Sequence, residues 1–321
     1  MKKYGLLLAF IVSIAFLLSS CNSLPTETSP APTQPSSQPS ETAEQVAEDP
    51  HIEIVFLDNP QESNNTDVYL QDMGTKEMQF FATISDINLQ HYHPYEYHNG
   101  NLYIIRRKGD YQESDDWTDE LWKYYGPGEG SMLYSIKGLD FRVSPDEEYI
   151  ALTGGDQFVG EKMVVLDVQE NTEQEFAADQ LVSGPAFLVG HLEWSDDGSE
   201  LWIESGGPGL FSFCRLNVTS WQIDIYDITE TPITRAEYEL NTNTGKLVFS
   251  DYPVFFDADS ADQFKESQTD VTLFVYDLVT RNLQQIAVSK AKEFDPLWLD
   301  VTTIEYNDPG GDGRTTSTVQ P

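Results

Sequence analysis

Apolar and polar residues alternate over short runs through the chain beyond residue 51, and Gly, Pro, Asn and Asp interrupt these runs. Interruptions come about every ten residues, which is the spacing of short strands joined by turns. Alternation with a period of two is typical of β-strands that bury one face, and few segments show the helical period. The pattern therefore predicts an all-β fold.

One hairpin recurs along the chain. Phe141–Leu152 and Leu192–Ile203 each contain a strand, a turn rich in Asp and its small polar neighbours, and a second strand. Weaker copies lie at Tyr238–Phe249 and Pro296–Tyr306, and a shorter one at Tyr95–Ile105. Each copy carries the turn chemistry of a β-hairpin, so five hairpins of this first type are predicted.

A second type of hairpin alternates with the first. Met163–Val168 leads to Glu173–Phe176, and Thr272–Leu278 leads to Asn282–Ile286. Three further copies begin at Val68–Gln71, Leu121–Tyr125 and Ile223–Ile228. Two alternating hairpins make a four-stranded unit of roughly 45–55 residues, a period that indicates a repeat architecture.

The first hairpin resembles a known repeat. Trp194–Gly198 reads Trp-Ser-Asp-Asp-Gly and Val143–Asp146 reads Val-Ser-Pro-Asp. These are similar to the Trp-Ser-Pro-Asp-Gly core in the propellers of TolB-like proteins and of prolyl-oligopeptidase relatives. The resemblance extends over most of residues 52–306, and it implies a β-propeller of four-stranded blades.

The number of blades is five to six. The N-terminal hairpin that begins near Val68 could pair with the C-terminal hairpin near Asp295 to form one four-stranded blade, and five blades would then close a ring. The strand Ile52–Leu57 then starts an incomplete sixth blade, paired with the tail after Arg314. A pair of β-sandwich domains is the alternative fold.

The N-terminus has the layout of an export signal. Two lysines precede an apolar run from Gly5 to Leu18, which is too short to cross a membrane. Leu18–Cys21 resembles the bacterial lipobox, which implies cleavage before Cys21 and a lipid, diacylglycerol with fatty acids such as palmitate, on that cysteine. Residues 21–50 are rich in Pro, Ser and Thr and poor in large apolar side chains, which predicts a disordered tether. We expect a signal peptide at 1–20, a tether at 21–50, a propeller domain at 51–321, and a lipid-anchored, extracytoplasmic location whose partner is the bilayer.

Charge excludes one class of partner. The chain has 54 acidic against 18 basic residues and a net charge of −36, so nucleic acid would be repelled. Once Cys21 carries lipid, Cys214 is the one remaining thiol, and its apolar surroundings predict a packed strand residue. The sequence has no Gly-x-Ser-x-Gly elbow, so we expect no peptidase activity.

Four polar residues fall at equivalent positions of the first hairpins. Asp140, His191, Glu237 and Asp295 each lie three residues before the aligned position of the first strand. Because first strands line the channel of a propeller, these residues are a candidate ring for a ligand or cation, with calcium the possible metal. They are also a candidate acid–base set for glycan hydrolysis. Polar residues that only bond to connecting loops are the plainer interpretation.

Two other groups are weaker metal candidates. His91 and His93 lie on one face of an extended segment, a pattern that suits a transition metal, although an aromatic-rich loop explains it as well. Asp257–Asp262 and Asp308–Gly313 offer oxygens for calcium but lack the EF-hand pattern, so we interpret them as exposed acidic turns.

Tether, repeats and the absence of a complete catalytic motif favour a non-enzymatic binding or scaffolding module with an unknown protein or glycan ligand. An extracytoplasmic glycan hydrolase that uses the carboxylate ring is the alternative. No cofactor is expected.

Overall fold

The computed structural model describes residues 52–58, 65–85, 94–108, 117–126, 128–154, 162–181, 189–207, 210–228 and 237–320. All of them belong to one unit of the chain, Asp49–Pro321. The predicted sites at Cys21, His91 and His93 lie outside the described residues. Within those residues, no helix is long and apolar enough to span a membrane.

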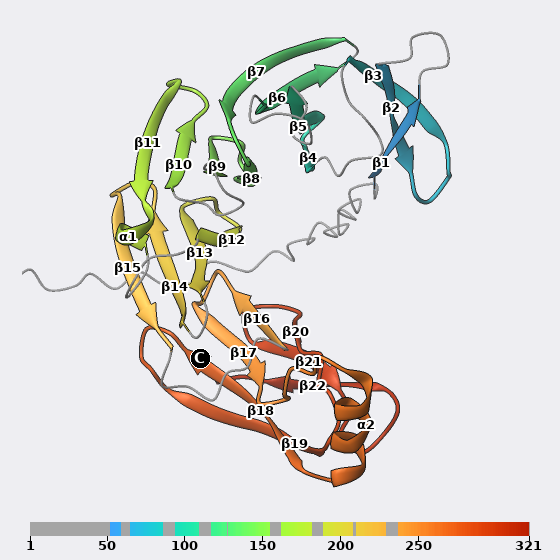
Figure 1. Cartoon of the computed structure of the whole chain (residues 1–321), viewed down its shortest axis with the longest axis vertical. Helices are drawn as coiled ribbons and strands as arrows, with labels where there is room; N and C mark the ends of the chain where they lie inside the picture. Colours follow the sequence, from blue (N-terminus) through green and yellow to red (C-terminus); the bar gives the residue numbers. More distant parts are fainter. Residues whose placement is uncertain are drawn as a thin grey trace, which may run out of the picture. The chain divides into compact units, whose positions relative to one another are not determined.

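The described strands form six antiparallel sheets that follow one another along the chain, and each is a meander of consecutive strands (Figure 1). Sheet 1 contains β1 (Ile52–Asp58), β2 (Asn65–Asp72) and β3 (Met78–Ser85), and sheet 2 contains β4 (Tyr95–His98), β5 (Asn101–Lys108), β6 (Thr118–Gly126) and β7 (Glu129–Ile136). Sheet 3 contains β8 (Asp140–Val143), β9 (Tyr149–Gly154), β10 (Lys162–Asp167) and β11 (Thr172–Ala177), and sheet 4 contains β12 (Val189–Trp194), β13 (Glu200–Gly207), β14 (Leu210–Asn217) and β15 (Gln222–Asp227). Sheet 5 contains β16 (Tyr238–Asn241), β17 (Lys246–Ser250), β18 (Asp270–Asp277) and β19 (Leu283–Lys290), and sheet 6 contains β20 (Leu297–Trp298), β21 (Thr303–Asn307) and β22 (Arg314–Thr318).

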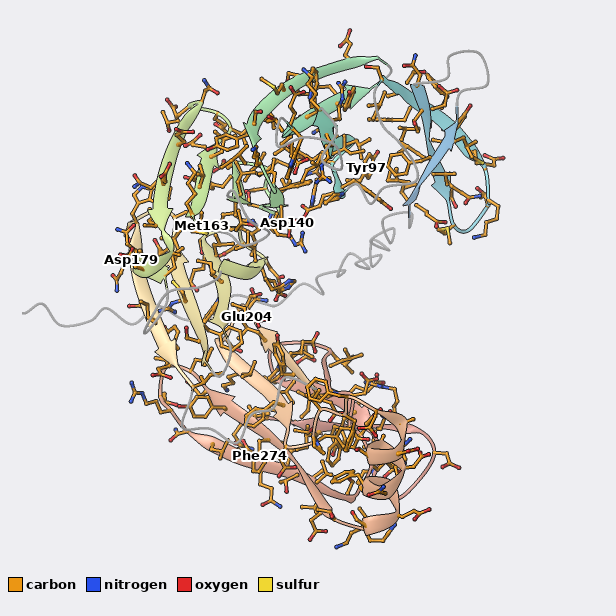
Figure 2. All side chains as sticks on the ribbon, viewed as in Figure 1. Tyr97, Asp140, Met163, Asp179, Glu204 and Phe274 are labelled. Atoms are coloured by element: carbon orange, nitrogen blue, oxygen red, sulfur yellow. The ribbon has the colours of Figure 1, made fainter. Side chains whose placement is uncertain are left out.

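Apolar clusters lie between consecutive sheets. The cluster between sheets 3 and 4 contains Met163 of β10, which Figure 2 labels, together with Trp194 and Cys214 of sheet 4. Comparable clusters join sheets 1 and 2, 2 and 3, 4 and 5, and 5 and 6. Each inner sheet thus packs both faces against its sequence neighbours, as blades of a propeller do, whereas a sandwich pairs two sheets. The prediction of an all-β propeller with four-stranded blades is confirmed, and Cys214 is a fully buried strand residue.

The ring closure expected from the sequence is wrong in its strand pairing. The hairpin β2–β3 pairs with β1, not with the C-terminal hairpin β20–β21. The tail strand β22 pairs with β21 and not with β1. Among the described residues the first and last sheets therefore have three strands each, and the sheet count is six. Alternation along a strand predicts which face is buried, but it carries no information about which distant edge a terminal strand joins.

Side chains of the repeated core fix the turns of the first hairpins. Ser195 Oγ donates to Asp197 Oδ1 at 2.8 Å and accepts from the N–H of Glu200 at 3.0 Å. Ser144 and Asp146 make the corresponding bonds in sheet 3. This network closes the turn before the second strand begins, which explains why the Ser-x-Asp spacing recurs.

In the part of the chain that the structure describes, two helices interrupt the strand order: α1 (Ala178–Leu181) and α2 (Ala258–Ser267). The acidic residues of Asp257–Asp262 are exposed as expected, but the segment begins a helix and is not a turn. Asp257 is the N-cap of α2 and accepts a hydrogen bond from the Ser260 N–H at 2.8 Å. Aspartate suits this place because it satisfies a free N–H and faces the positive end of the helix dipole.

Candidate functional site

The first strand of each blade presents alternate residues to the next sheet. In β12 these are His191 and Glu193, and around β16 they are Glu237 and Glu239. Leu192, which lies between His191 and Glu193, is buried against the preceding sheet, and Tyr238, which lies between Glu237 and Glu239, is partly buried there. Side-chain alternation along a strand thus places a row of polar residues at each contact between sheets.

A carboxylate-to-backbone bond recurs at two of these contacts. Glu96 Oε2 of β4 accepts from the Val143 N–H of β8 at 2.9 Å. Glu239 Oε2 of β16 accepts from the Trp298 N–H of β20 at 2.5 Å. The strand registers show that Glu96, Glu193 and Glu239 occupy equivalent positions. Glu193 should therefore hold the N–H of Leu240, but the described residues show no such bond.

A second bond recurs through tryptophan. The Trp194 Nε1–H donates to the Arg142 carbonyl at 3.1 Å, and the Trp298 Nε1–H donates to the Glu239 carbonyl at 3.2 Å. In sheet 5 the equivalent residue is Leu240, which has no polar atom on its side chain. Between sheets 4 and 5, neither recurring bond is present among the described residues.

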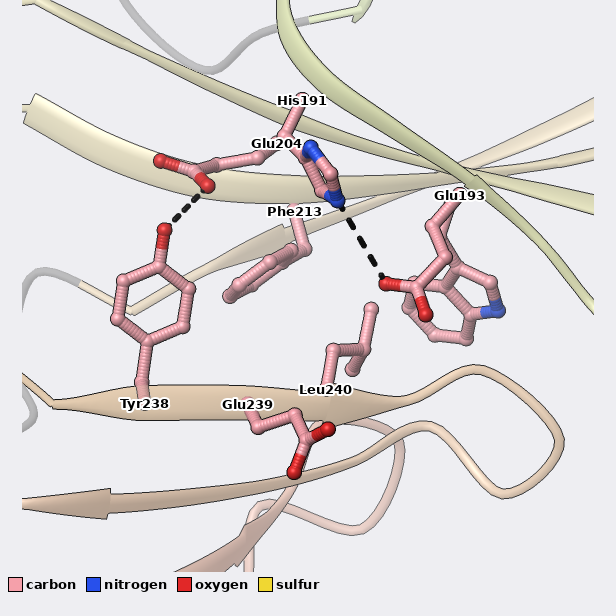
Figure 3. A pocket seen from close by; sticks show the side chains of 8 residues that line it. His191, Glu193, Glu204, Phe213, Tyr238, Glu239 and Leu240 are labelled. Atoms are coloured by element: carbon pink, nitrogen blue, oxygen red, sulfur yellow. Dashed lines mark hydrogen bonds and ion pairs between the residues drawn. The ribbon is translucent and has the colours of Figure 1, made fainter. Parts of the chain in front are cut away.

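The space left between sheets 4 and 5 is a cavity of about 340 Å³ (Figure 3). At one end, Trp202 Nε1–H donates to the Thr242 carbonyl at 2.8 Å. At the other end, the Tyr238 hydroxyl donates to Glu204, as Figure 3 shows. The lining residues are His191, Glu193, Trp202, Glu204, Phe213, Tyr238, Glu239 and Leu240.

The cavity is an unfavourable environment for the charge of Glu193. Burial and the nearby Glu239 carboxylate raise the pKa of Glu193 to about 7, although its side chain is 45% exposed. His191 lies beside it, with Nε2 3.9 Å from the Glu193 carboxylate. Burial, helped by the Arg142 charge, lowers the pKa of His191, so that imidazole is largely neutral at pH 7. Burial also raises the pKa of Glu239.

A second cavity continues from the first along the turns. It has a volume of about 450 Å³ and shares Glu193, Glu239 and Leu240 with the first. Asp196 and Asn243 lie on its wall and exchange two hydrogen bonds, at 2.7 and 3.0 Å, between the turns of sheets 4 and 5. The cavity between the sheets is therefore bounded by polar contacts but open toward sheet 6.

The four predicted ring residues do not share one site, although Glu237 and Asp295 are in contact. Asp140 is exposed and accepts from the Phe141 N–H at 2.9 Å (Figure 2). Glu237 accepts from the Ser250 hydroxyl and, at 3.0 Å, from the Asp295 N–H. The Asp295 carboxylate pairs with Arg314 at 2.9 Å.

Of these four residues, His191 is the one that lines the cavity between sheets 4 and 5. Among the described residues, no three His, Cys, Asp or Glu side chains form a group that could hold a metal ion. The arrangement thus gives the predicted calcium site no support, and the acid–base role of the four residues remains a prediction.

The residues that sequence reasoning missed lie two positions further along the same strands. Glu193 and Glu239 each follow a chosen residue by two, so they share its face of the strand. One signal was available. Leu240 stands where Trp194 and Trp298 have an indole, and a smaller side chain at a contact between blades favours a cavity, although Val143 in sheet 3 shows that this position alone does not decide it.

The fold and cavity define a propeller-type protein with an acidic site between two blades. No family model and no curated protein matches the sequence. Similar solved structures include TolB from Acinetobacter baumannii, with a TM-score of 0.41 and 11% identity over 73% of this chain and 53% of that chain, so this chain spans about half the length of that TolB.

Two further structures are similar at the same level. Oligogalacturonate lyase from Vibrio parahaemolyticus has a TM-score of 0.48 and 13% identity over 79% of this chain and 74% of that chain. The β-propeller domain of the Trilobed protease from Pyrococcus furiosus has an open velcro topology. Its TM-score is 0.45, with 14% identity over 67% of this chain and 62% of that chain. At these identities the likeness concerns the fold and assigns no activity.

Proposed function

We propose that this protein is a lipid-anchored, extracytoplasmic binding protein, and that the cavity between sheets 4 and 5 is its ligand site. The observation that carries the proposal is Glu193, a half-buried carboxylate that faces a cavity where its equivalents, Glu96 and Glu239, bond to the next sheet. A concave site with an aromatic floor and a few polar groups is the usual form of a small-molecule site.

The anchor rests on Cys21 and the residues before it. Growth of cells with a palmitate analogue tests this part, because the full chain should incorporate the label and a Cys21→Ala variant should not. Equal labelling of both proteins would contradict the anchor.

The ligand site is tested by filling the cavity. In a Leu240→Trp variant the indole should lie where Trp194 and Trp298 lie in their sheets, and its N–H should reach the Glu193 carbonyl. We expect ligands that raise the melting temperature of the full chain to lose this effect in Leu240→Trp. Retention of every ligand effect by a folded Leu240→Trp variant would contradict the site.

Glycan hydrolysis is the second candidate, and one observation favours it. A carboxyl with a pKa of about 7, as in Glu193, suits a general acid at neutral pH. Its possible partner carboxylates, however, are already engaged: Glu204 by the Tyr238 hydroxyl and Glu239 by the Trp298 N–H. Binding without catalysis therefore fits the contacts better. Hydrolysis of a glycan panel by the full chain that disappears in Glu193→Gln would reverse this preference.

A further inference from the structure

We infer that two copies of this chain associate through the free edge of β22, with the two β22 strands antiparallel across a twofold axis. The pairing joins the two copies of sheet 6 into one continuous sheet. This inference concerns sheet 6 and does not rest on the ligand site proposed between sheets 4 and 5.

Sheet 6 has no fourth strand among the described residues. In sheets 2 to 5 the third strand in the order is paired on both edges, as β14 is with β13 and β15. β22 has the same third place, and of the described strands β21 alone pairs with it. The tail after β22 is held in place, since Lys246 Nζ donates to the Gln320 carbonyl at 2.8 Å. One edge of β22 is therefore a fixed row of backbone N–H and C=O groups that a further strand can bind.

Two backbone bonds identify the groups on this edge. The Asp308 N–H donates to the Gly313 carbonyl at 2.8 Å, and the Val319 N–H donates to the Thr302 carbonyl at 2.7 Å. Both bonds continue the register of β21 with β22, and hydrogen-bonded pairs in an antiparallel ladder fall at every second residue. Alternate residues from 313 to 319 therefore bond to β21, and the residues between them point their backbone groups to the open edge.

The residues that point outward are Arg314, Thr316 and Thr318. A twofold axis at Thr316 places this residue opposite its own copy and Arg314 opposite Thr318 of the copy. Each of these pairs joins two outward-pointing residues, so all three can exchange backbone bonds, about six in total. The open edge of β22 is thus complementary to itself, which is what a twofold interface requires.

The side chains of β22 also favour a second copy as the occupant. The strand reads Arg-Thr-Thr-Ser-Thr and has no acidic residue, although the chain has 54. In the twofold register Arg314 faces Thr318, so no two like charges are opposite each other. Asp295 and Glu305 of the same chain already pair with Arg314. Threonine pairs across antiparallel strands are favourable.

Other edge strands carry features that oppose such pairing. β11 contains Glu173 and Glu175, β15 contains two aspartates, and β1 contains Glu53 and Asp58. β3, β7 and β19 each have a register shift against the neighbouring strand. Charges and bulges are the usual protection of sheet edges. β22 has a regular register and no acidic residue, so its edge is open to a second strand.

Cross-linking through one introduced cysteine tests the inference. In the twofold register the Cα atoms of Thr316 and its copy lie about 5.5 Å apart, within the range of about 4.4–6.8 Å that a disulfide spans. The detergent-solubilised full chain with Thr316→Cys, oxidised by copper phenanthroline in air, should give a disulfide-linked dimer on a non-reducing gel. We expect at least about five times the dimer that Gln174→Cys gives at an exposed position of β11. The wild type controls for Cys21 and for the buried Cys214.

A second cysteine position tests the register. Thr318 lies opposite Arg314 of the copy and about 13 Å from Thr318 of the copy. Thr318→Cys should therefore cross-link no better than Gln174→Cys. Equal cross-linking of Thr316→Cys and Gln174→Cys, or of Thr316→Cys and Thr318→Cys, would overturn the inference.

Sedimentation velocity of the full chain measures the association without a cross-link. Each copy has a net charge of −36, so the wild-type dimer fraction should rise between about 0.01 M and 0.15 M salt as repulsion is screened. Thr316→Pro removes an N–H that makes no bond to β21, a change that an edge strand tolerates. This variant should keep the melting temperature of the wild type at low salt and remain monomeric at 0.15 M. A wild type that is monomeric at both salt concentrations, or a Thr316→Pro variant that dimerises equally well, would contradict the interface.

Discussion

Two contacts between blades use a glutamate in opposite ways. Between sheets 2 and 3, the Glu147 carboxylate accepts from the Tyr103 hydroxyl at 2.5 Å, from Asn101 at 2.8 Å and from Lys123 Nζ at 3.0 Å. Between sheets 4 and 5, Glu193 faces a cavity instead. Both side chains are partly or wholly removed from water, so the difference lies in their partners.

The pKa values of the two carboxyls record this difference. Burial opposes ionisation of Glu147, but its hydrogen bonds from Tyr103 and Lys123 outweigh burial and lower its pKa. Burial without such donors raises the pKa of Glu193. A partnered carboxylate holds two sheets together, whereas a carboxylate without donors keeps its capacity to bind something else.

Backbone geometry supports a structural role for Glu147. Its φ is 60°, a left-handed value that Gly198 adopts at the equivalent turn of sheet 4 with a φ of 69°. Left-handed backbone costs about 1 kcal/mol or more for a residue with a side chain. The fold keeps glutamate there because its carboxylate reaches sheet 2.

The largest expected effect is that of Glu147→Ala. The substitution leaves the buried Lys123 ammonium without its carboxylate partner, and we expect a loss of about 3 kcal/mol in the free energy of unfolding. Urea denaturation of the full chain measures it. Glu148→Ala, at the exposed neighbouring position, is the matched control and should cost less than about 0.5 kcal/mol. If both variants lose the same free energy of unfolding, the Glu147 carboxylate does not stabilise the contact between sheets 2 and 3.

The second-largest expected effect comes from a substitution that makes the contact between sheets 5 and 6 resemble the contact between sheets 4 and 5. Trp298→Leu reproduces at sheets 5 and 6 the residue found at Leu240, and it removes the indole N–H from the Glu239 carbonyl. We expect a loss of about 2 kcal/mol in the free energy of unfolding, from the new cavity and the lost bond. An unchanged urea midpoint would mean that the tryptophan pattern does not close the contacts.

The sequence was sufficient for the repeat but not for the site. Alternating residues and the Ser-x-Asp turns predict the hairpins because those signals are local. The pairing of β1 and β22 depends on distant edges, which alternation does not encode. Alignment of the strands selected His191, which does line the cavity. Glu193 can be recognised only from the structure, where its equivalents Glu96 and Glu239 bond to the backbone of the next sheet.

A smaller effect concerns stability and pH. The folded pKa of Glu193, about 7, lies above its ordinary value of 4.5, so the protonated carboxyl favours folding at low pH and this contribution is lost as pH rises through 7. Glu193→Gln should therefore be more stable than the wild type at pH 8, by about 1 kcal/mol after allowance for solvent screening, and about equal at pH 5. For a chain of this size the melting temperature should rise by about 2–4 °C at pH 8. A larger gain in stability of Glu193→Gln at pH 5 than at pH 8 would contradict a raised pKa of Glu193 in the folded protein.

The central claim is that Glu193, unlike Glu96 and Glu239, is left without a donor from the next sheet and faces an acidic cavity. Its carboxyl pKa, measured by carbon-13 NMR titration and assigned by the signal missing in Glu193→Gln, tests this most directly. We predict a midpoint near the value of about 7. A midpoint at or below the ordinary value of 4.5 would show that Glu193 is held by donors or by open water, and would contradict the account.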